Sequence, residues 1–161
     1  MLAEGDRRTL AAFFGVLEEE LGGPPTAPAA WRVPRLDVAA SAGPGALVDA
    51  ELEVGADMID PALAKRLRLA PGASAMIRAR GDSMEPGLLD GDHLLVDTAR
   101  VQADDRGGVF VVRIDGALMV KRVRRARGRL VVSSDNPAAA PVPSGAVQVI
   151  GRVVWVMREP R

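Results

Sequence analysis

Short runs of alternating apolar and polar residues fill much of this chain, and the pattern predicts a protein built mainly from β-strands. Residues 47–54 alternate as a half-buried strand does, and residues 33–38 are expected to be extended. Further strands are expected at residues 75–79, 93–97, 109–114, 117–125, 130–133 and 147–157. Many short strands with few helices imply a compact, mainly β domain.

Helices are predicted at two places. Residues 9–21 carry apolar side chains at steps of three and four, with Thr9 as the N-cap and a pair of glycines at the end. A second, short helix is predicted at residues 60–67, where Asp60 is the N-cap and a proline occupies the first helical position.

The stretch between the first helix and the first strand is rich in proline, glycine and alanine, which is typical of a linker. We therefore expect a short helical segment at residues 1–23, a linker at residues 24–31 and the mainly β domain at residues 32–161. No internal repeat is found in the sequence.

The composition excludes several kinds of site. Lysine plus arginine and aspartate plus glutamate each number 21 in the 161 residues, so no net charge favours nucleic acid or a membrane. Cysteine is absent and His93 is the only histidine, which excludes thiolate zinc sites and multi-histidine metal sites within one chain. We expect no metal and no cofactor. No apolar run is long enough to cross a bilayer and no signal peptide is evident, so a cytoplasmic protein without membrane contact is expected.

A serine and a lysine form the most informative pair of residues. Gly81-Asp82-Ser83-Met84-Glu85-Pro86 places Ser83 on a glycine-bounded turn, and Lys121 follows in an apolar, strand-like run. A serine hydroxyl becomes a good nucleophile when a nearby base takes its proton. A lysine in a dry, apolar setting can lose its charge and serve as that base. The pair therefore indicates a Ser–Lys hydrolytic dyad.

The same turn can aim the backbone N–H groups of Asp82 and Ser83 at one point, where they would form an oxyanion hole. Each half of the pattern also has a plainer interpretation. Ser83 can belong to a polar surface turn, and Lys121 can lie on an edge strand with its amine in solvent. Asp90-Gly91-Asp92 predicts a tight turn rather than a paired-carboxylate site, and His93 is expected to be structural.

The motifs together resemble a known family. The Ser83 turn, Asp90-Gly91-Asp92, Arg113-Ile114-Asp115-Gly116, Val120-Lys121-Arg122 and Ser134-Asp135-Asn136-Pro137 occur in the order and spacing of the C-terminal domain of LexA-type and phage-type repressors, and the SOS mutagenesis protein UmuD is similar. The resemblance covers about residues 33–158. It implies a mainly β, LexA-like peptidase fold of the β-clip type, with Ser83 as nucleophile and Lys121 as general base.

The resemblance also implies partners and a substrate. Such domains dimerise through their C-terminal strand region, which here contains Val153, Val154, Trp155 and Val156. Their substrate is usually an Ala–Gly bond of the same chain, cleaved with the help of the RecA filament, and Ala42-Gly43 stands in the matching place. A plain flexible loop is the alternative for that segment, and Pro44 directly after it restricts the backbone.

Residues 9–22 resemble the last helices of the helix-turn-helix domain that precedes such modules, but the recognition-helix pair is absent. DNA binding is therefore expected only through a helix-turn-helix domain that is incomplete in this chain. The leading hypothesis is a self-cleaving repressor module of SOS or prophage regulation that acts as a homodimer. The alternative is a non-cleaving dimerisation module of a transcriptional regulator, or a UmuD-like polymerase accessory protein.

Overall fold

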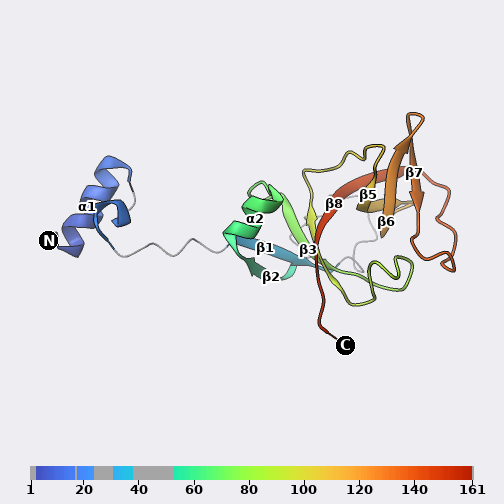
Figure 1. The fold of residues 1–161 in the computed structure, drawn as a ribbon, viewed down its shortest axis with the longest axis horizontal. Helices are drawn as coiled ribbons and strands as arrows, with labels where there is room; N and C mark the ends of the chain where they lie inside the picture. Colours follow the sequence, from blue (N-terminus) through green and yellow to red (C-terminus); the bar gives the residue numbers. More distant parts are fainter. Residues whose placement is uncertain (1–2, 17, 24–30, 38–52, 161) are drawn as a thin grey trace. The chain divides into compact units, whose positions relative to one another are not determined.

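The computed structural model describes residues 3–16, 18–23, 31–37 and 53–160. The chain divides into two compact units, residues 1–30 and residues 31–161. In the first unit the described residues form only helix, and in the second they form mainly strand (Figure 1). The expected fold class, mainly β with a short N-terminal helix, is confirmed.

The N-terminal helix differs from its predicted bounds. Helix α1 spans Glu4–Phe14 and is followed by the 3-10 helix η1, Glu18–Leu21. Gly15 ends α1 because its φ of 66° places it in the left-handed region, where glycine meets no steric penalty. Thr9 is not an N-cap, since it lies inside α1 and its hydroxyl donates to the carbonyl of Gly5 at 2.9 Å.

The second unit is built on one mixed sheet. Its order is β2-β1-β3-β4-β8-β5-β6-β7, and only the β1–β3 pair is parallel among the described strands. The strands are β1 Trp31–Leu36, β2 Glu53–Ile59, β3 Ser74–Arg78, β4 His93–Asp97, β5 Gly108–Ile114, β6 Ala117–Ala126, β7 Arg129–Ser133 and β8 Val147–Met157. Helix α2, Pro61–Leu67, follows β2, and Asp60 caps it by accepting from the N–H of Ala62 at 2.7 Å, as predicted.

Pairing between strands explains where the predicted bounds shifted. The first strand begins at Trp31 rather than residue 33, because Trp31 pairs with Ile59 at the far end of β2. The next strand was expected at residues 47–54. Its described part runs from Glu53 to Ile59, opposite β1, and residues 38–52 lie outside the described part of the chain.

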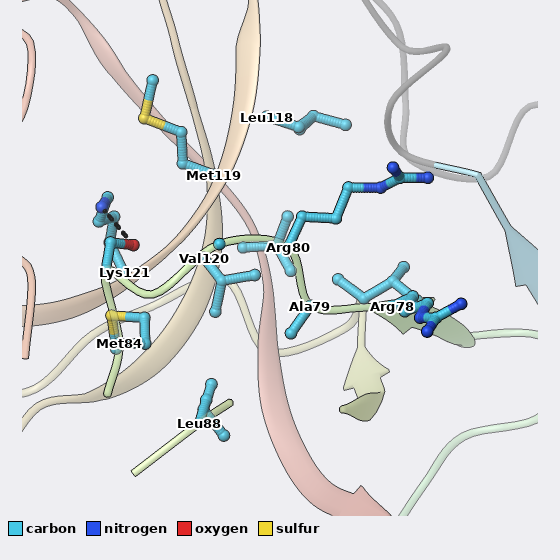
Figure 2. A pocket seen from close by; sticks show the side chains of 13 residues that line it. Arg78, Ala79, Arg80, Met84, Leu88, Leu118, Met119, Val120 and Lys121 are labelled. Atoms are coloured by element: carbon cyan, nitrogen blue, oxygen red, sulfur yellow. Dashed lines mark hydrogen bonds between the residues drawn. The ribbon is translucent and has the colours of Figure 1, made fainter. Parts of the chain in front are cut away.

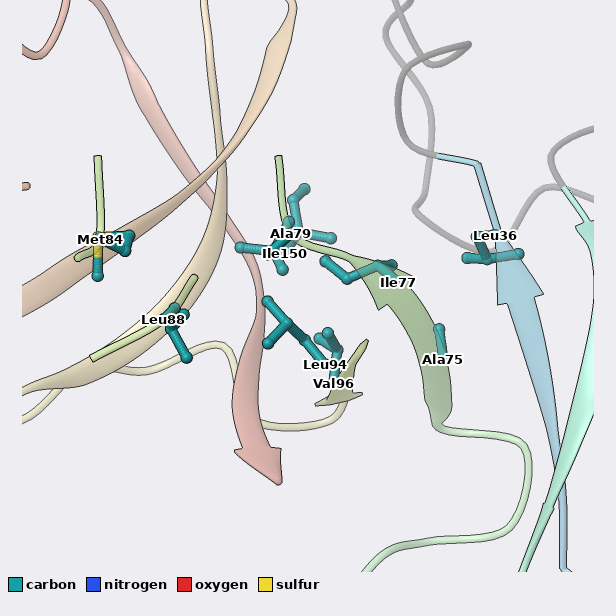
Figure 3. Close-up of a cluster of buried hydrophobic side chains, with 10 residues drawn as sticks. Leu36, Ala75, Ile77, Ala79, Met84, Leu88, Leu94, Val96 and Ile150 are labelled. Atoms are coloured by element: carbon teal, nitrogen blue, oxygen red, sulfur yellow. The ribbon is translucent and has the colours of Figure 1, made fainter. Parts of the chain in front are cut away.

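Apolar side chains form a separate cluster on each side of this sheet. One lies under α2 and includes Val33, Ala64 and Leu95. The other is drawn in Figure 3 and contains Met84 and Leu88, which come from the loop between β3 and β4. Both side chains are less than 10% exposed, so the loop that contains Ser83 is anchored in the core at two points.

Gly151 allows β8 to lie close against β4. A β-carbon at Gly151 would lie 2.7 Å from Cγ1 of Val96 and 2.8 Å from the carbonyl oxygen of Asp97. Gly151→Ala is expected to lower the free energy of unfolding by about 1–3 kcal/mol, the range typical of overpacking. Chemical denaturation measures this, with Gly55→Ala as control because a β-carbon there meets nothing within 4 Å. Equal unfolding free energies for the two variants would contradict the expectation.

Candidate active site

Ser83 lies in the loop of residues 79–92, whose ends are joined by two backbone hydrogen bonds of 2.8 Å and 3.0 Å. Gly81 has a φ of 76°, a conformation that side-chain-bearing residues rarely adopt. The N–H of Gly81 donates to Oδ1 of Asp90 at 2.8 Å. The turn before Ser83 is therefore fixed to the far end of its own loop.

Asp92 ties the same loop to the C-terminal segment. Its carboxylate is buried, accepts from the N–H of Leu89 at 2.8 Å, and accepts two hydrogen bonds from Arg158 at 2.7 and 2.6 Å. Arg158 also donates to the carbonyl of Gly87 at 3.2 Å, and its hydrogen bond to Asp92 raises the pKa of the guanidinium. The predicted Asp90-Gly91-Asp92 turn thus serves to hold the loop.

Lys121 lies in the middle of β6, the central strand of the β5–β6–β7 meander. It pairs with Phe110 of β5, and its side chain is only 7% exposed. Burial lowers the pKa of Lys121 from the ordinary lysine value, because the charged form loses solvation. The interpretation of Lys121 as an edge-strand lysine with its amine in solvent is therefore wrong. The chain has 19 arginines and two lysines, and only a lysine can give up its proton at an accessible pH.

The structure brings Ser83 and Lys121 together. Nζ of Lys121 donates to Oγ of Ser83 at 2.9 Å, which is the dashed contact in Figure 2. Nζ also donates to Oγ of Ser134 at 2.9 Å. The amine of Lys121 thus has two hydroxyl partners, and no carboxylate is paired with it among the described residues. An uncompensated, buried amine is the arrangement in which the neutral form is favoured.

The segment after β7 connects the serine loop to the lysine strand. Asp135 accepts two hydrogen bonds from Arg122, at 3.0 and 2.6 Å, which fix it beside β6. Asn136 donates from its side chain to the carbonyl of Asp82 at 3.1 Å and from its backbone to the carbonyl of Ser83 at 3.0 Å. The positions of the two candidate catalytic side chains are therefore coupled through one short segment.

A cavity of about 210 Å³ opens beside the two side chains (Figure 2). Its lining is mostly apolar, with two arginines at its rim and Ser83 and Lys121 in its wall; the residues are Ile77, Arg78, Ala79, Arg80, Gly81, Ser83, Met84, Leu88, Val111, Leu118, Met119, Val120 and Lys121. A cavity of this kind can receive small apolar side chains of a polypeptide next to the serine hydroxyl.

The other predicted site residues have varied placements. Ala42 and Gly43 lie outside the described residues. Within the described part, the backbone N–H groups of Asp82 and Ser83 donate to no protein acceptor. On β8, Val153 and Val154 pack against the core, whereas Trp155 and Val156 are 38% and 37% exposed.

Sequence reasoning gave no role to Ser134, although the signal was present. A two-residue turn at Arg127-Gly128, with φ values of 49° and 77°, joins β6 to β7 and pairs Arg122 with Ser133. One step further along the same antiparallel register, Ser134 faces Lys121. The turn therefore sets the partner of the lysine. The described residues hold no group of histidine, cysteine, aspartate and glutamate side chains that could bind a metal ion. None of the helices in the described ranges is long and apolar enough to cross a membrane.

Comparison with known proteins agrees with this arrangement. The family described as Peptidase S24-like matches residues 35–154. The LexA repressor of Mycolicibacterium smegmatis is 36% identical over 89 residues, which are 55% of this chain and 36% of that protein. The LexA repressors of Mycobacterium leprae and Mycobacterium tuberculosis are each 36% identical over 89 residues, covering 55% of this chain and 37% of either protein. The match thus spans little more than a third of the length of these curated relatives.

Proposed function

The chain belongs to the Peptidase S24-like family, and from that premise we propose that its β unit is a self-cleaving peptidase with Ser83 as nucleophile and Lys121 as general base. The observation that carries the proposal is the 2.9 Å contact between the Ser83 hydroxyl and the buried Lys121 amine. A hydroxyl and a neutral amine at this distance are within reach for direct proton transfer.

The proposed reaction has two stages. Oγ of Ser83 attacks the carbonyl carbon of the scissile peptide bond while its proton passes to Nζ of Lys121. The carbon–nitrogen bond then breaks, and the leaving amine takes the proton from Lys121. Water adds to the resulting ester, Lys121 again receives a proton, and the new carboxylate leaves Ser83 free.

The backbone N–H groups of Asp82 and Ser83 are proposed to hold the negative charge that develops on the carbonyl oxygen. Preorganised donors of this kind typically contribute a factor of about 10²–10³ to the rate. The absence of a protein acceptor for either N–H within the described residues supports the assignment.

The proposed substrate is the Ala42–Gly43 bond of the same chain. Small residues on both sides of a bond let the backbone approach a nucleophile closely, and the mostly apolar cavity beside Ser83 suits them. Attack within one chain is effectively unimolecular, which favours a slow catalyst with a single turnover.

Similarity to LexA repressors supports a regulatory role for this peptidase. We propose a module of a transcriptional repressor in SOS or prophage regulation. It would act in the cytoplasm as a homodimer, respond to the RecA filament, and contact DNA through a helix-turn-helix domain that is incomplete here.

Incubation at alkaline pH followed by intact-mass measurement tests the peptidase activity. The expected result is slow conversion to two fragments, residues 1–42 and 43–161, with a rate that rises as Lys121 loses its proton. The same protein at neutral pH is the control and should cleave more slowly. An intact mass at every pH, with and without activated RecA filament, would favour the non-cleaving dimerisation module.

The exposed end of β8 is the proposed dimer contact. Trp155 and Val156 present apolar surface there, next to Val153 and Val154. Val156→Asp is expected to weaken self-association at least tenfold, because a charge would be buried between two subunits. Sedimentation equilibrium measures this, and Val54→Asp on the exposed face of β2 is the matched control. Equal dissociation constants for the two variants would place the contact elsewhere.

A further inference from the structure

Ser134 has a position that the Ser83–Lys121 pair alone does not explain. Its hydroxyl oxygen lies 2.9 Å from Nζ of Lys121, the same distance as that of Ser83. Ser134 is half-buried, and it follows directly on the residue of β7 that pairs with Arg122. The contact thus arises from sheet register and not from a chance approach of a long surface side chain.

A general base needs its lone pair directed at the proton it takes. A neutral lysine amine has one lone pair and two N–H groups, and it rotates freely about its last carbon–nitrogen bond. If a fixed acceptor takes one N–H, the rotation is restricted and the lone pair can face the other hydroxyl. Ser134 is such an acceptor on one side of Nζ, and Ser83 lies on the other.

The neighbours of Ser134 keep its hydroxyl in place. Asp135 is held by two hydrogen bonds from Arg122, and Asn136 is held by hydrogen bonds to the carbonyls of Asp82 and Ser83. Ser134 is therefore fixed to the lysine strand through one neighbour and to the serine loop through the other. Small motions of either element would change the geometry of the lysine and both hydroxyls together.

We propose that Ser134 is a positioning residue that accepts one N–H of neutral Lys121 and thereby directs the amine lone pair at the Ser83 hydroxyl. The proposal rests on the proposed peptidase function and deepens it. Ser134 takes no proton and forms no bond to substrate; it acts through Lys121. The charged groups around the amine are Arg122 and Asp135, which pair with each other, and Arg78 and Arg80 at the rim of the cavity.

The pH–rate profile of self-cleavage is the first test. Ser134→Ala is expected to lower the plateau rate at high pH by about 10- to 100-fold, the scale of effect seen when reacting groups lose their alignment. The pH midpoint should move downward, because the charged amine loses an acceptor. Ser134→Thr keeps the hydroxyl and should restore most of the rate, and Ser133→Ala on the neighbouring exposed serine should change nothing.

A purely structural role for Ser134 gives a different profile. Loosening of the site would admit water to Lys121 and move the pH midpoint upward, toward that of an ordinary lysine. That result, or a plateau rate equal to that of Ser133→Ala, would overturn the proposal.

A second readout separates this proposal from the peptidase function. Lysine-selective ¹³C NMR sees only Lys65 and Lys121, the two lysines of the chain. In a Ser83→Ala background, which cannot cleave, adding Ser134→Ala should lower the titration midpoint of Lys121, while adding Ser133→Ala leaves it unchanged. If the unmodified chain never cleaves but this shift is observed, the proposed function fails and the contact of Ser134 with the amine stands. If the shift is absent, the role of Ser134 fails whether or not the chain cleaves.

Discussion

Lys121→Met is expected to abolish self-cleavage at every pH and, at neutral pH, to make the folded protein more stable. Methionine fills a similar volume and has no base to offer, so cleavage should fall by at least about 10³-fold. Because burial lowers the pKa of Lys121 in the folded state, the unfolded chain binds that proton more tightly than the folded chain does. The charged lysine therefore opposes folding, and methionine relieves this.

The gain in stability has a defined pH dependence. It should be largest at pH values below the lowered pKa of Lys121, shrink between that pKa and the ordinary lysine value, and vanish above it. Urea denaturation at a series of pH values measures this. Lys65→Met, which changes an exposed lysine of α2, is the matched control and should alter neither stability nor cleavage. A Lys121→Met variant that still cleaves, or that is less stable at neutral pH than at high pH relative to the unchanged protein, would contradict the account.

Ser83→Ala is the second change with a large expected effect. Removing the nucleophile should lower the rate of cleavage at the Ala42–Gly43 bond by at least about 10³-fold, with no residual pH-dependent fragment formation. The fold should remain, because the loop is anchored through Met84 and Leu88 and not through the hydroxyl. Time courses of intact mass at alkaline pH provide the measurement.

The matched control for this change is Ser144→Ala, at an exposed serine in a different loop. It should cleave at the rate of the unchanged protein. Fragments of the same masses from Ser83→Ala, formed at a similar rate, would mean that the bond breaks without the Ser83 hydroxyl, and the assignment of the nucleophile would be wrong.

Much of the fold could be predicted because the signals are local. The strands at residues 93–97 and 147–157 have the predicted bounds, since apolar runs bounded by turn residues define them. Helix α2 was predicted through its cap, because Asp60 bonds to an N–H only two residues away. The ends of α1 and β2 were misplaced, because one depends on the left-handed conformation of Gly15 and the other on pairing with β1.

The candidate site shows the same division. The residue types at positions 83 and 121 and their motifs were enough to predict a serine beside a lysine, and the contact between them is present in the structure. The burial that lowers the lysine pKa was an expectation, because it depends on β5, β7 and the serine loop packing around one strand. Ser134 was missed because its nearness to Lys121 follows from the register of a hairpin, which requires both strands and the turn to be considered together.

Titration of Lys121 itself tests the central claim most directly. Lysine-selective ¹³C NMR of the full chain carrying Ser83→Ala resolves Lys65 and Lys121, so the exposed lysine serves as an internal reference. The account predicts that Lys121 loses its proton at a clearly lower pH than Lys65, because its amine is buried without a carboxylate partner among the described residues. Coincident titration of the two amines would contradict it, since a lysine that stays charged as readily as an exposed one cannot take the proton of a serine.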